Sequence, residues 1–243
     1  MEWTDEAIIL EARPHGENHA VVNVFTPSAG RVAALVHGGQ GRQKKPLLQA
    51  GNSVKATWKG RSEDSLGHFA LELITPRAAT LMYNQLGLTA LNAVISVLRL
   101  CLPERQSLPN LYDGTVILLE LLEEKDIWPI VLAKWEVGLL KELGFGLVLD
   151  QCAATGNRLE DGAELVFVSP KSGNAVSYAA GLPYKDKMLP LPPFLIDQGE
   201  PLRQDIAAAL RMTAYFLEER ILLPANTELP DARKRLQDRL FRG

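Results

Sequence analysis

The stretch that decides the fold runs from Arg31 to Arg61 and reads RVAALVHGGQGRQKKPLLQAGNSVKATWKGR. Residues 31–37 and 52–59 alternate in the manner of β-strands, whereas glycine and basic residues dominate the segment between them. The stretch contains seven Lys and Arg residues and no Asp or Glu, and the acid-free window extends from residue 18 to residue 62. The whole chain has a formal net charge of −3, so the sequence concentrates positive charge on an otherwise acidic protein.

Five short segments in this part of the chain are typical of β-strands, because they are rich in Val, Ile, Phe, Thr and Trp and are separated by Gly, Pro, Asn or Ser. They are residues 5–13, 19–26, 31–37, 52–59 and 66–75. TPSAGR at 26–31 has turn chemistry, since Pro27 fixes one backbone dihedral and Gly30 tolerates a positive φ. Five short strands within about 75 residues indicate a small closed barrel, because closure removes exposed sheet edges.

The pattern becomes helical after Pro76. Residues 147–199 interrupt it, since they lack a long helical period and are rich in Gly, Pro and Ser. Asp231 is a candidate N-terminal cap for the last helix, which is short and basic. The expected elements are helices at 78–100 and 111–124, a helix ending at Gly144, a hairpin at 165–178, a stiff extended connector at 189–195, a helix at 202–223 and the basic helix. The predicted fold class is α+β with several domains.

Composition and charge suit a protein of the cytoplasm. The chain has 243 residues, and two cysteines in that length fit a reducing compartment. Its N-terminus, MEWTDEAIIL, has acids where a signal peptide needs positive charge. Residues 78–98 carry no charge and are long enough to span a bilayer, but six polar residues within them favour a buried helix of a soluble domain. We therefore expect no membrane segment.

No arrangement of residues typical of catalysis or cofactor binding is found in the sequence. The four histidines all fall in the barrel region and none has the H-E-x-x-H spacing of a metal site. There is no G-x-S-x-G nucleophile elbow. GGQGRQKKP at 38–46 resembles a phosphate loop only superficially, because the required spacing and the Ser or Thr after the lysine are absent. We expect a protein that is not an enzyme and needs no cofactor.

Two interpretations of the basic stretch remain open at this point. Basic runs are usually solvated faces and flexible loops, whereas a small barrel with basic loops is also the design that tracks a nucleic-acid strand. Bases would then stack on aromatic side chains, for which the barrel offers Trp3, Phe25, Trp58 and Phe69. Such residues are more often core, and strand alternation does not decide which face each one uses.

Longer motifs point to a known family. EAIILEARPHGENHAVVNVFTPSAGRVAALVHGG at 6–39 resembles the N-terminus of the bacterial recombination mediator RecO family. WEVGLLKELGFGLVLDQCAATG at 135–156, VSPKSG at 168–173 and PDARKRLQDRL at 230–240 extend the resemblance over nearly the whole chain. The residues that match the N-terminal pattern are Arg13, Pro14, Glu17, Phe25, Thr26, Gly30, Arg31, Leu48 and Gln49.

The resemblance implies an OB-fold barrel at 1–77, a helical domain at 78–146 and 200–243, and a zinc-finger-like insertion at 147–199. It implies a mediator of DNA repair and homologous recombination that binds single- and double-stranded DNA and anneals complementary strands. It also implies partners: RecR, the C-terminal tail of single-strand-binding protein and, functionally, RecA, which the protein helps to load. Such a protein would be cytoplasmic and associated with the nucleoid.

The sequence departs from the family pattern at the zinc positions. Many relatives carry two C-x-x-C pairs there, whereas this chain has Cys152, Thr155, Ser177 and Ala180. One thiol and two hydroxyls do not hold zinc, so we expect a degenerate insertion without a metal. His37 and Gln40 stand where many relatives have basic residues, so DNA affinity is expected to be weaker or more sensitive to pH.

We therefore expect a DNA-binding mediator that neutralises phosphate charge with its barrel. The alternative is a non-enzymatic adaptor whose basic loop binds an acidic protein partner. The residues expected to contact DNA are Arg13, Arg31, His37, Arg42, Lys44, Lys45, Lys55, Lys59 and Arg61.

Overall fold

A computed structural model describes residues 1–62 and 64–241. The chain divides into two compact units. The first consists of residues 1–125 and 230–239, and the second of residues 126–229 and 240–243. Within the described ranges, every helix is too short or too polar to cross a bilayer.

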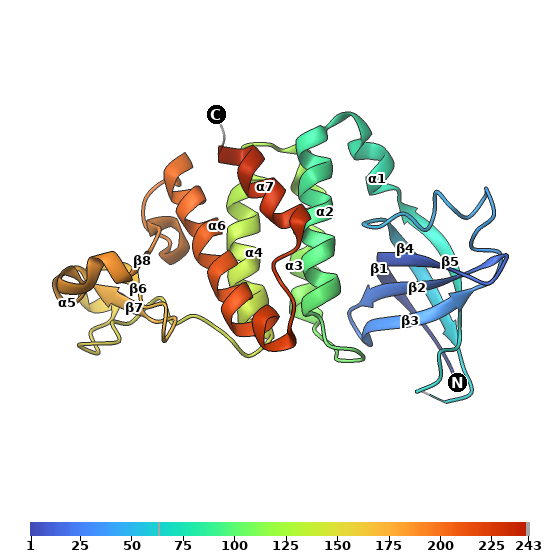
Figure 1. The fold of residues 1–243 in the computed structure, drawn as a ribbon, viewed down its shortest axis with the longest axis horizontal. Coiled ribbons are helices and arrows are strands. Elements are labelled where there is room, and N and C mark those ends of the chain that lie inside the picture. The colour runs from blue at the N-terminus through green and yellow to red at the C-terminus, as the bar shows by residue number, and fades with distance from the viewer. Residues whose placement is uncertain (63, 242–243) are drawn as a thin grey trace. The chain divides into compact units, whose positions relative to one another are not determined.

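The first unit begins with a five-stranded closed barrel (Figure 1). Its strand order is β1-β2-β3-β5-β4, and β1 pairs with β2 over one part of its length and with β4 over the other. The predicted strands all form, and β1 starts earlier than expected because its first residues pair with β4. The strands are β1 (Glu2–His15), β2 (His19–Thr26), β3 (Gly30–Val36), β4 (Ser53–Lys59) and β5 (His68–Thr75).

Strand alternation fills the barrel with apolar side chains. Along β3, every second residue is buried, as expected for a strand with one face on a core. Burying each such side chain contributes about 1.5–3 kcal/mol relative to leaving it exposed. The interior cluster consists of Ala7, Ile9, Ala20, Val22, Val24, Val32, Ala34, Val36, Leu48, Val54, Ala56, Trp58 and Phe69.

Helices of the same unit cover the outer face of β1 and β2. Phe25 points outward from β2 and packs edge-to-face against Tyr112, with ring centroids 5.4 Å apart. The segment of the chain before Tyr112 also bonds directly to the barrel, since the backbone N–H of Arg105 donates to the carbonyl of Arg31 at 3.0 Å. The helices of this unit are α1 (Arg77–Thr80), a 3-10 turn (Leu81–Tyr83), α2 (Gln85–Cys101), α3 (Pro109–Glu120), a 3-10 turn (Leu121–Glu123) and α7 (Asp231–Phe241), which belongs to it as far as Arg239.

The prediction of a single helix at 78–100 is wrong in one respect, because the helix is interrupted near Asn84. This residue is non-helical, and its side chain accepts a hydrogen bond from the Gly87 N–H at 2.9 Å. Asn84 is therefore the N-cap of α2, and the preceding residues form separate short turns. At the other end of the chain, Asp231 is the first residue of α7.

The second unit combines helices with a small sheet. Helices α4 and α6 pack together, and the Thr213 hydroxyl donates to a carboxylate oxygen of the fully buried Glu136. The expected hairpin forms as β6 and β7, but the expected extended connector includes β8 and a 3-10 turn at Pro193–Ile196. The elements are α4 (Trp128–Glu142), a 3-10 turn (Leu159–Asp161), β6 (Leu165–Val168), β7 (Ala175–Ser177), α5 (Tyr178–Gly181), a 3-10 helix (Leu182–Lys187), β8 (Leu189–Pro190), the 3-10 turn already named, α6 (Arg203–Leu217), a π-helical turn (Glu218–Leu222) and a 3-10 turn (Leu223–Ala225).

Candidate nucleic-acid interface

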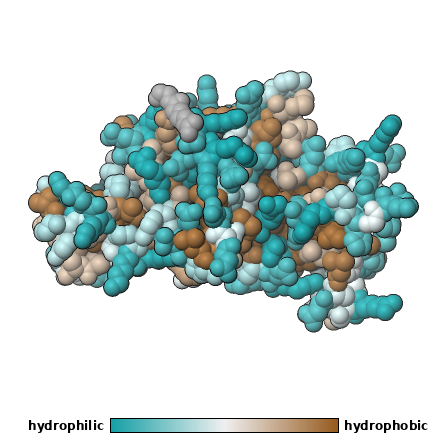
Figure 2. All heavy atoms as spheres, in the orientation of Figure 1, coloured by the Kyte–Doolittle hydropathy of each residue, from teal (hydrophilic) through white to brown (hydrophobic). Residues whose placement is uncertain are grey.

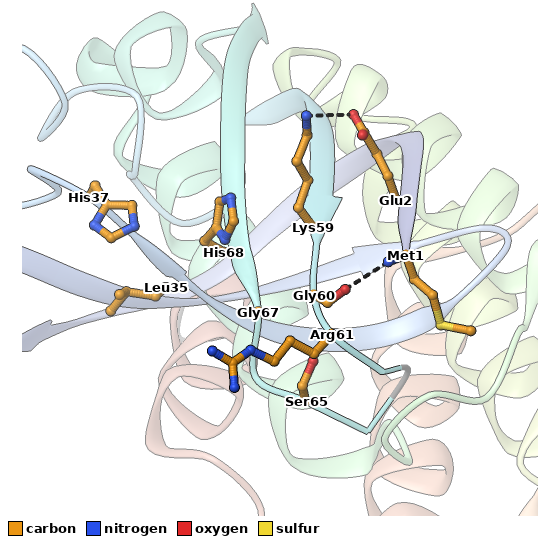
Figure 3. A pocket seen from close by; sticks show the side chains of 10 residues that line it. All are labelled: Met1, Glu2, Leu35, His37, Lys59, Gly60, Arg61, Ser65, Gly67 and His68. Carbon is orange, nitrogen blue, oxygen red and sulfur yellow. Dashed lines mark hydrogen bonds and ion pairs between the residues drawn. The ribbon is translucent and has the colours of Figure 1, made fainter.

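A depression of about 800 Å³ opens on the barrel where β3, β4 and β5 meet the 60–67 segment (Figure 3). Lys59, Arg61, His37 and His68 all line it. The amino group of Met1 also lies there and donates to the Gly60 carbonyl at 2.8 Å. Figure 2 shows hydrophilic and hydrophobic residues intermingled on the face in view.

The loop between β3 and β4 supplies three exposed cations. Arg42, Lys44 and Lys45 are all exposed, and none of them forms an ion pair within residues 1–62 and 64–241. The Lys44 ammonium donates to the backbone carbonyl of His37 at 2.7 Å, which ties the loop to the end of β3. Because no carboxylate offsets these charges locally, they are available to an anionic ligand.

Three of the remaining predicted cations are compensated by nearby acids. Arg13 pairs with Glu11 at 3.0 Å, Arg31 with Glu104 at 3.4 Å and Lys59 with Glu2 at 3.0 Å. The last of these pairs crosses the mouth of the depression (Figure 3).

The positive charge of Lys55 is compensated as well, by carboxylates on the two neighbouring strands. It lies opposite Glu6 on β1 and opposite Glu72 on β5, so a carboxylate flanks it on each side of β4. Among residues 1–62 and 64–241, the predicted interface therefore divides into a compensated set of Arg13, Arg31, Lys55 and Lys59 and an uncompensated set, without ion pairs or cross-strand carboxylates, of His37, Arg42, Lys44, Lys45 and Arg61.

Three of the four aromatic residues considered as base-stacking platforms are core residues. Trp58 and Phe25 are fully buried, and Phe69 is 4% exposed. Trp3 is partly buried and stacks on Trp58 with ring centroids 6.0 Å apart. Trp58 also donates its indole N–H to the Leu66 carbonyl at 3.2 Å, so its polar atom is satisfied inside the protein. Phe25, Trp58 and Phe69 are therefore unavailable for stacking on bases.

His68 is a site residue that the sequence reasoning missed. It is exposed at the start of β5, and its ring centroid lies 5.8 Å from that of His37. The only signal in the sequence was that all four histidines fall in the barrel region, which does not say that two of them meet.

The chain is similar to known proteins over nearly its whole length. A model of the RecO N-terminal region, "Recombination protein O N terminal", matches residues 1–77, and "Recombination protein O C terminal" matches residues 85–228. The chain is 45% identical to "DNA repair protein RecO" of Caulobacter vibrioides over 99% of this chain and 98% of that one. The corresponding proteins of Roseobacter denitrificans (44%, covering 100% and 99%) and Rhodospirillum centenum (43%, covering 98% and 94%) are similar over the same extent.

The chain belongs to the RecO family. The barrel of the structure coincides with the RecO N-terminal match, and the helices with small sheet fall mainly in the C-terminal match.

The positions at which the sequence resemblance places zinc ligands do not fit a metal in this chain. Cys152 is 1% exposed, and its sulfur accepts a hydrogen bond from the Ser177 N–H at 3.3 Å. Burial raises the pKa of this thiol, but hydrogen bonds from Ser177 and Thr155 outweigh it and lower the pKa to about 6. The donor set of one thiol and two hydroxyls, with Ala180 in the fourth position, lacks the ligands that zinc prefers. Nowhere in the described part of the chain do three or more His, Cys, Asp or Glu residues form a group able to hold a metal ion.

Proposed function

We propose that this RecO-family protein is a non-enzymatic mediator of DNA repair and homologous recombination that binds single- and double-stranded DNA through its barrel. The observation that carries the proposal is the uncompensated set of cations on the barrel. His37 and Arg61 line the depression, and the exposed loop of Arg42, Lys44 and Lys45 is tied to it where Lys44 donates to the His37 carbonyl. Each phosphate that a cation neutralises releases counterions, which gives affinity without sequence preference. Lowering the repulsion between two strands in this way would help complementary strands to anneal.

We propose the roles in RecA loading and in partner binding from membership of the RecO family. The protein would help to load RecA onto DNA covered by single-strand-binding protein, and would engage RecR and the C-terminal tail of single-strand-binding protein. We place this activity in the cytoplasm, at the nucleoid. The nine predicted contacts are proposed to contribute unequally, because four of them are compensated by carboxylates.

The test is fluorescence anisotropy with a labelled single-stranded oligonucleotide across a salt series. The variant Arg42→Ala/Lys44→Ala/Lys45→Ala should lose affinity and about two units of the slope of log K against log salt, since each phosphate contact on a single strand contributes about 0.7. Truncation at these exposed loop positions leaves the barrel core intact.

A matched control removes three exposed lysines from the second unit, as Lys171→Ala/Lys185→Ala/Lys187→Ala, and should retain the wild-type slope. Equal losses in the two variants would show that net charge, and not the loop, governs binding. If the wild type fails to bind DNA at low salt, the basic loop is better explained as the docking site of an acidic protein.

A further inference from the structure

All four histidines of the chain lie along one edge of the barrel. His15 near the end of the β1–β2 hairpin is the register partner of His19. The His19 and His37 rings meet edge to face with centroids 5.0 Å apart, and the His37 and His68 centroids are 5.8 Å apart. These residues come from β1, β2, the end of β3 and β5, and together they form what we call the histidine row.

The histidine row adjoins the candidate interface. His37 and His68 line the same depression as Lys59 and Arg61, and the backbone of His37 holds the Lys44 ammonium. Figure 3 shows the two imidazoles on neighbouring strands of the depression, with Lys59 beyond His68. The charged groups on the strands of the barrel are Glu2, Asp5, Glu6, Glu11, Arg13, Arg31, Lys55, Lys59 and Glu72, and the depression adds the Met1 amino group and Arg61. Glu2 is ion-paired with Lys59 and Glu11 with Arg13. Glu17, Lys44 and Asp64 lie on the adjoining loops.

The rings are free to act as donors to phosphate oxygens. Nδ1 of His19 accepts a hydrogen bond from the Gly38 N–H at 3.4 Å, so in the neutral ring Nε2 carries the proton and is the donor. Within the described ranges, neither ring nitrogen of His37 or of His68 has a hydrogen-bond partner, and both residues are exposed. Phosphate oxygens accept from an imidazole N–H, and a protonated imidazole adds a second N–H and a positive charge.

The rings couple binding to protonation. A negative charge close to imidazole rings favours their protonated forms. A phosphate placed beside them supplies the compensating negative charge. Histidine is the side chain whose charge ordinarily changes between pH 5 and 8, so this coupling operates near physiological pH.

We propose that the histidine row is a phosphate-binding subsite of the barrel, at which binding of a nucleic-acid backbone takes up protons. The inference rests on the proposed function, since it assigns a subsite and a pH response to the same interface. His37 and His68 are its central members, because both rings face the depression. The uncompensated lysines and arginines contribute throughout the range of about pH 6 to 8, whereas the histidine row adds affinity as the pH falls.

The experiment measures the dissociation constant of a labelled twenty-nucleotide dT strand by anisotropy at about pH 6 to 8 and constant ionic strength. Uptake of one proton raises affinity by at most about tenfold per pH unit. The wild type should bind more tightly as the pH falls. The variant His37→Gln/His68→Gln should lose more than half of this dependence, because a glutamine amide donates hydrogen bonds but does not take up a proton.

Two controls separate the histidines from other groups. Cys152→Ser removes the thiol whose pKa is lowered to about 6 and should leave the pH dependence of binding unchanged. Calorimetry in PIPES and in Tris buffer, neither of which supplies phosphate, should show a different apparent binding enthalpy for the wild type, reflecting protons taken up, and a smaller difference for the double variant.

The outcomes distinguish this inference from the proposed function. Binding that is independent of pH, or a pH dependence that survives intact in His37→Gln/His68→Gln, overturns the histidine subsite. The proposed function still stands in that case if the Arg42, Lys44 and Lys45 variant loses affinity. Absence of wild-type binding at every pH and at low salt overturns both.

Discussion

At the scale of single residues, Gly30 shows how closely the barrel and the helical part of the first unit approach each other. Gly30 has a φ of 67°, and a Cβ built on it would lie 1.9 Å from the carbonyl oxygen of Gln106. Gly38 has the same φ of 67°, but a Cβ there would meet nothing within 4 Å. The two positions share a backbone conformation and differ only in the space around them.

The different surroundings of Gly30 and Gly38 predict two different losses of stability on substitution by alanine. Gly38→Ala should lower the free energy of unfolding by about 1–2 kcal/mol, which is the cost of the left-handed conformation alone. Gly30→Ala should cost a further 1–3 kcal/mol or so, because the backbone of the 104–107 segment must move. Urea unfolding of the full chain measures both, and equal losses would show that this segment yields without cost.

Cys152 predicts a pH dependence of stability. Its pKa falls from 9.0 to about 6 in the folded protein, so the folded state favours the thiolate. This stabilisation is fully present above pH 9 and is lost as the pH falls towards 6. The difference in free energy of unfolding between wild type and Cys152→Ser should therefore increase from pH 6 to pH 9.

The thiolate can also be observed directly by its absorbance at 240 nm. The wild-type minus Cys152→Ser difference should titrate near pH 6, because Cys101 is present in both proteins and cancels. A midpoint near 9 would mean that desolvation cancels the effect of the hydrogen bonds from Ser177 and Thr155.

At the scale of elements, the start of α2 depends on one side chain. Asn84 accepts from the Gly87 N–H at 2.9 Å and also donates to the Leu122 carbonyl at 3.4 Å. Asn92 lies in the middle of the same helix, is exposed and bonds only to the Leu88 carbonyl of the preceding turn. One asparagine caps the helix, and the other occupies a position where alanine is the better helix former.

We therefore expect the same substitution to have opposite effects at these positions. Asn84→Ala should destabilise the protein by about 1 kcal/mol through loss of the cap. Asn92→Ala should be neutral or slightly stabilising. Midpoints of urea unfolding compare the two, and a similar loss in both variants would argue that Asn84 does not act as a cap.

At the scale of the whole molecule, the barrel depends on the helices that follow it in the first unit. Ile8 and Phe25 are fully buried, yet they are outside the interior cluster because they belong to the outer face of β1 and β2. Arg77, just after the barrel, is also buried and donates to the Ser53 hydroxyl. Burial lowers the pKa of its guanidinium, against the opposing effect of Glu120.

This dependence predicts the behaviour of fragments. A fragment of residues 1–77 should expose Ile8 and Phe25, bind the dye ANS and unfold at lower urea concentration than the barrel of the intact chain. A fragment of residues 1–125 retains α2 and α3 and should bind less dye. Cooperative unfolding of the shorter fragment without dye binding would contradict this view of the barrel.

The sequence by itself determined the elements and the charge of the barrel. The five strands follow from local alternation and turn residues, and the acid-free window is a property of the chain that needs no structure. The break before α2 was also present in the sequence, as an asparagine followed by a helical pattern, but the apolar run that continues through it concealed the cap.

Only the tertiary structure decided which cations are left uncompensated and which histidines meet. Lys55 lies opposite Glu6 and Glu72, and His37 beside His19 and His68, through strand pairings between distant parts of the chain. The same pairings place Trp58 and Phe69 in the core of the barrel. Local sequence fixes what each strand is, but register and barrel closure fix its neighbours, and electrostatics at a surface depends on neighbours.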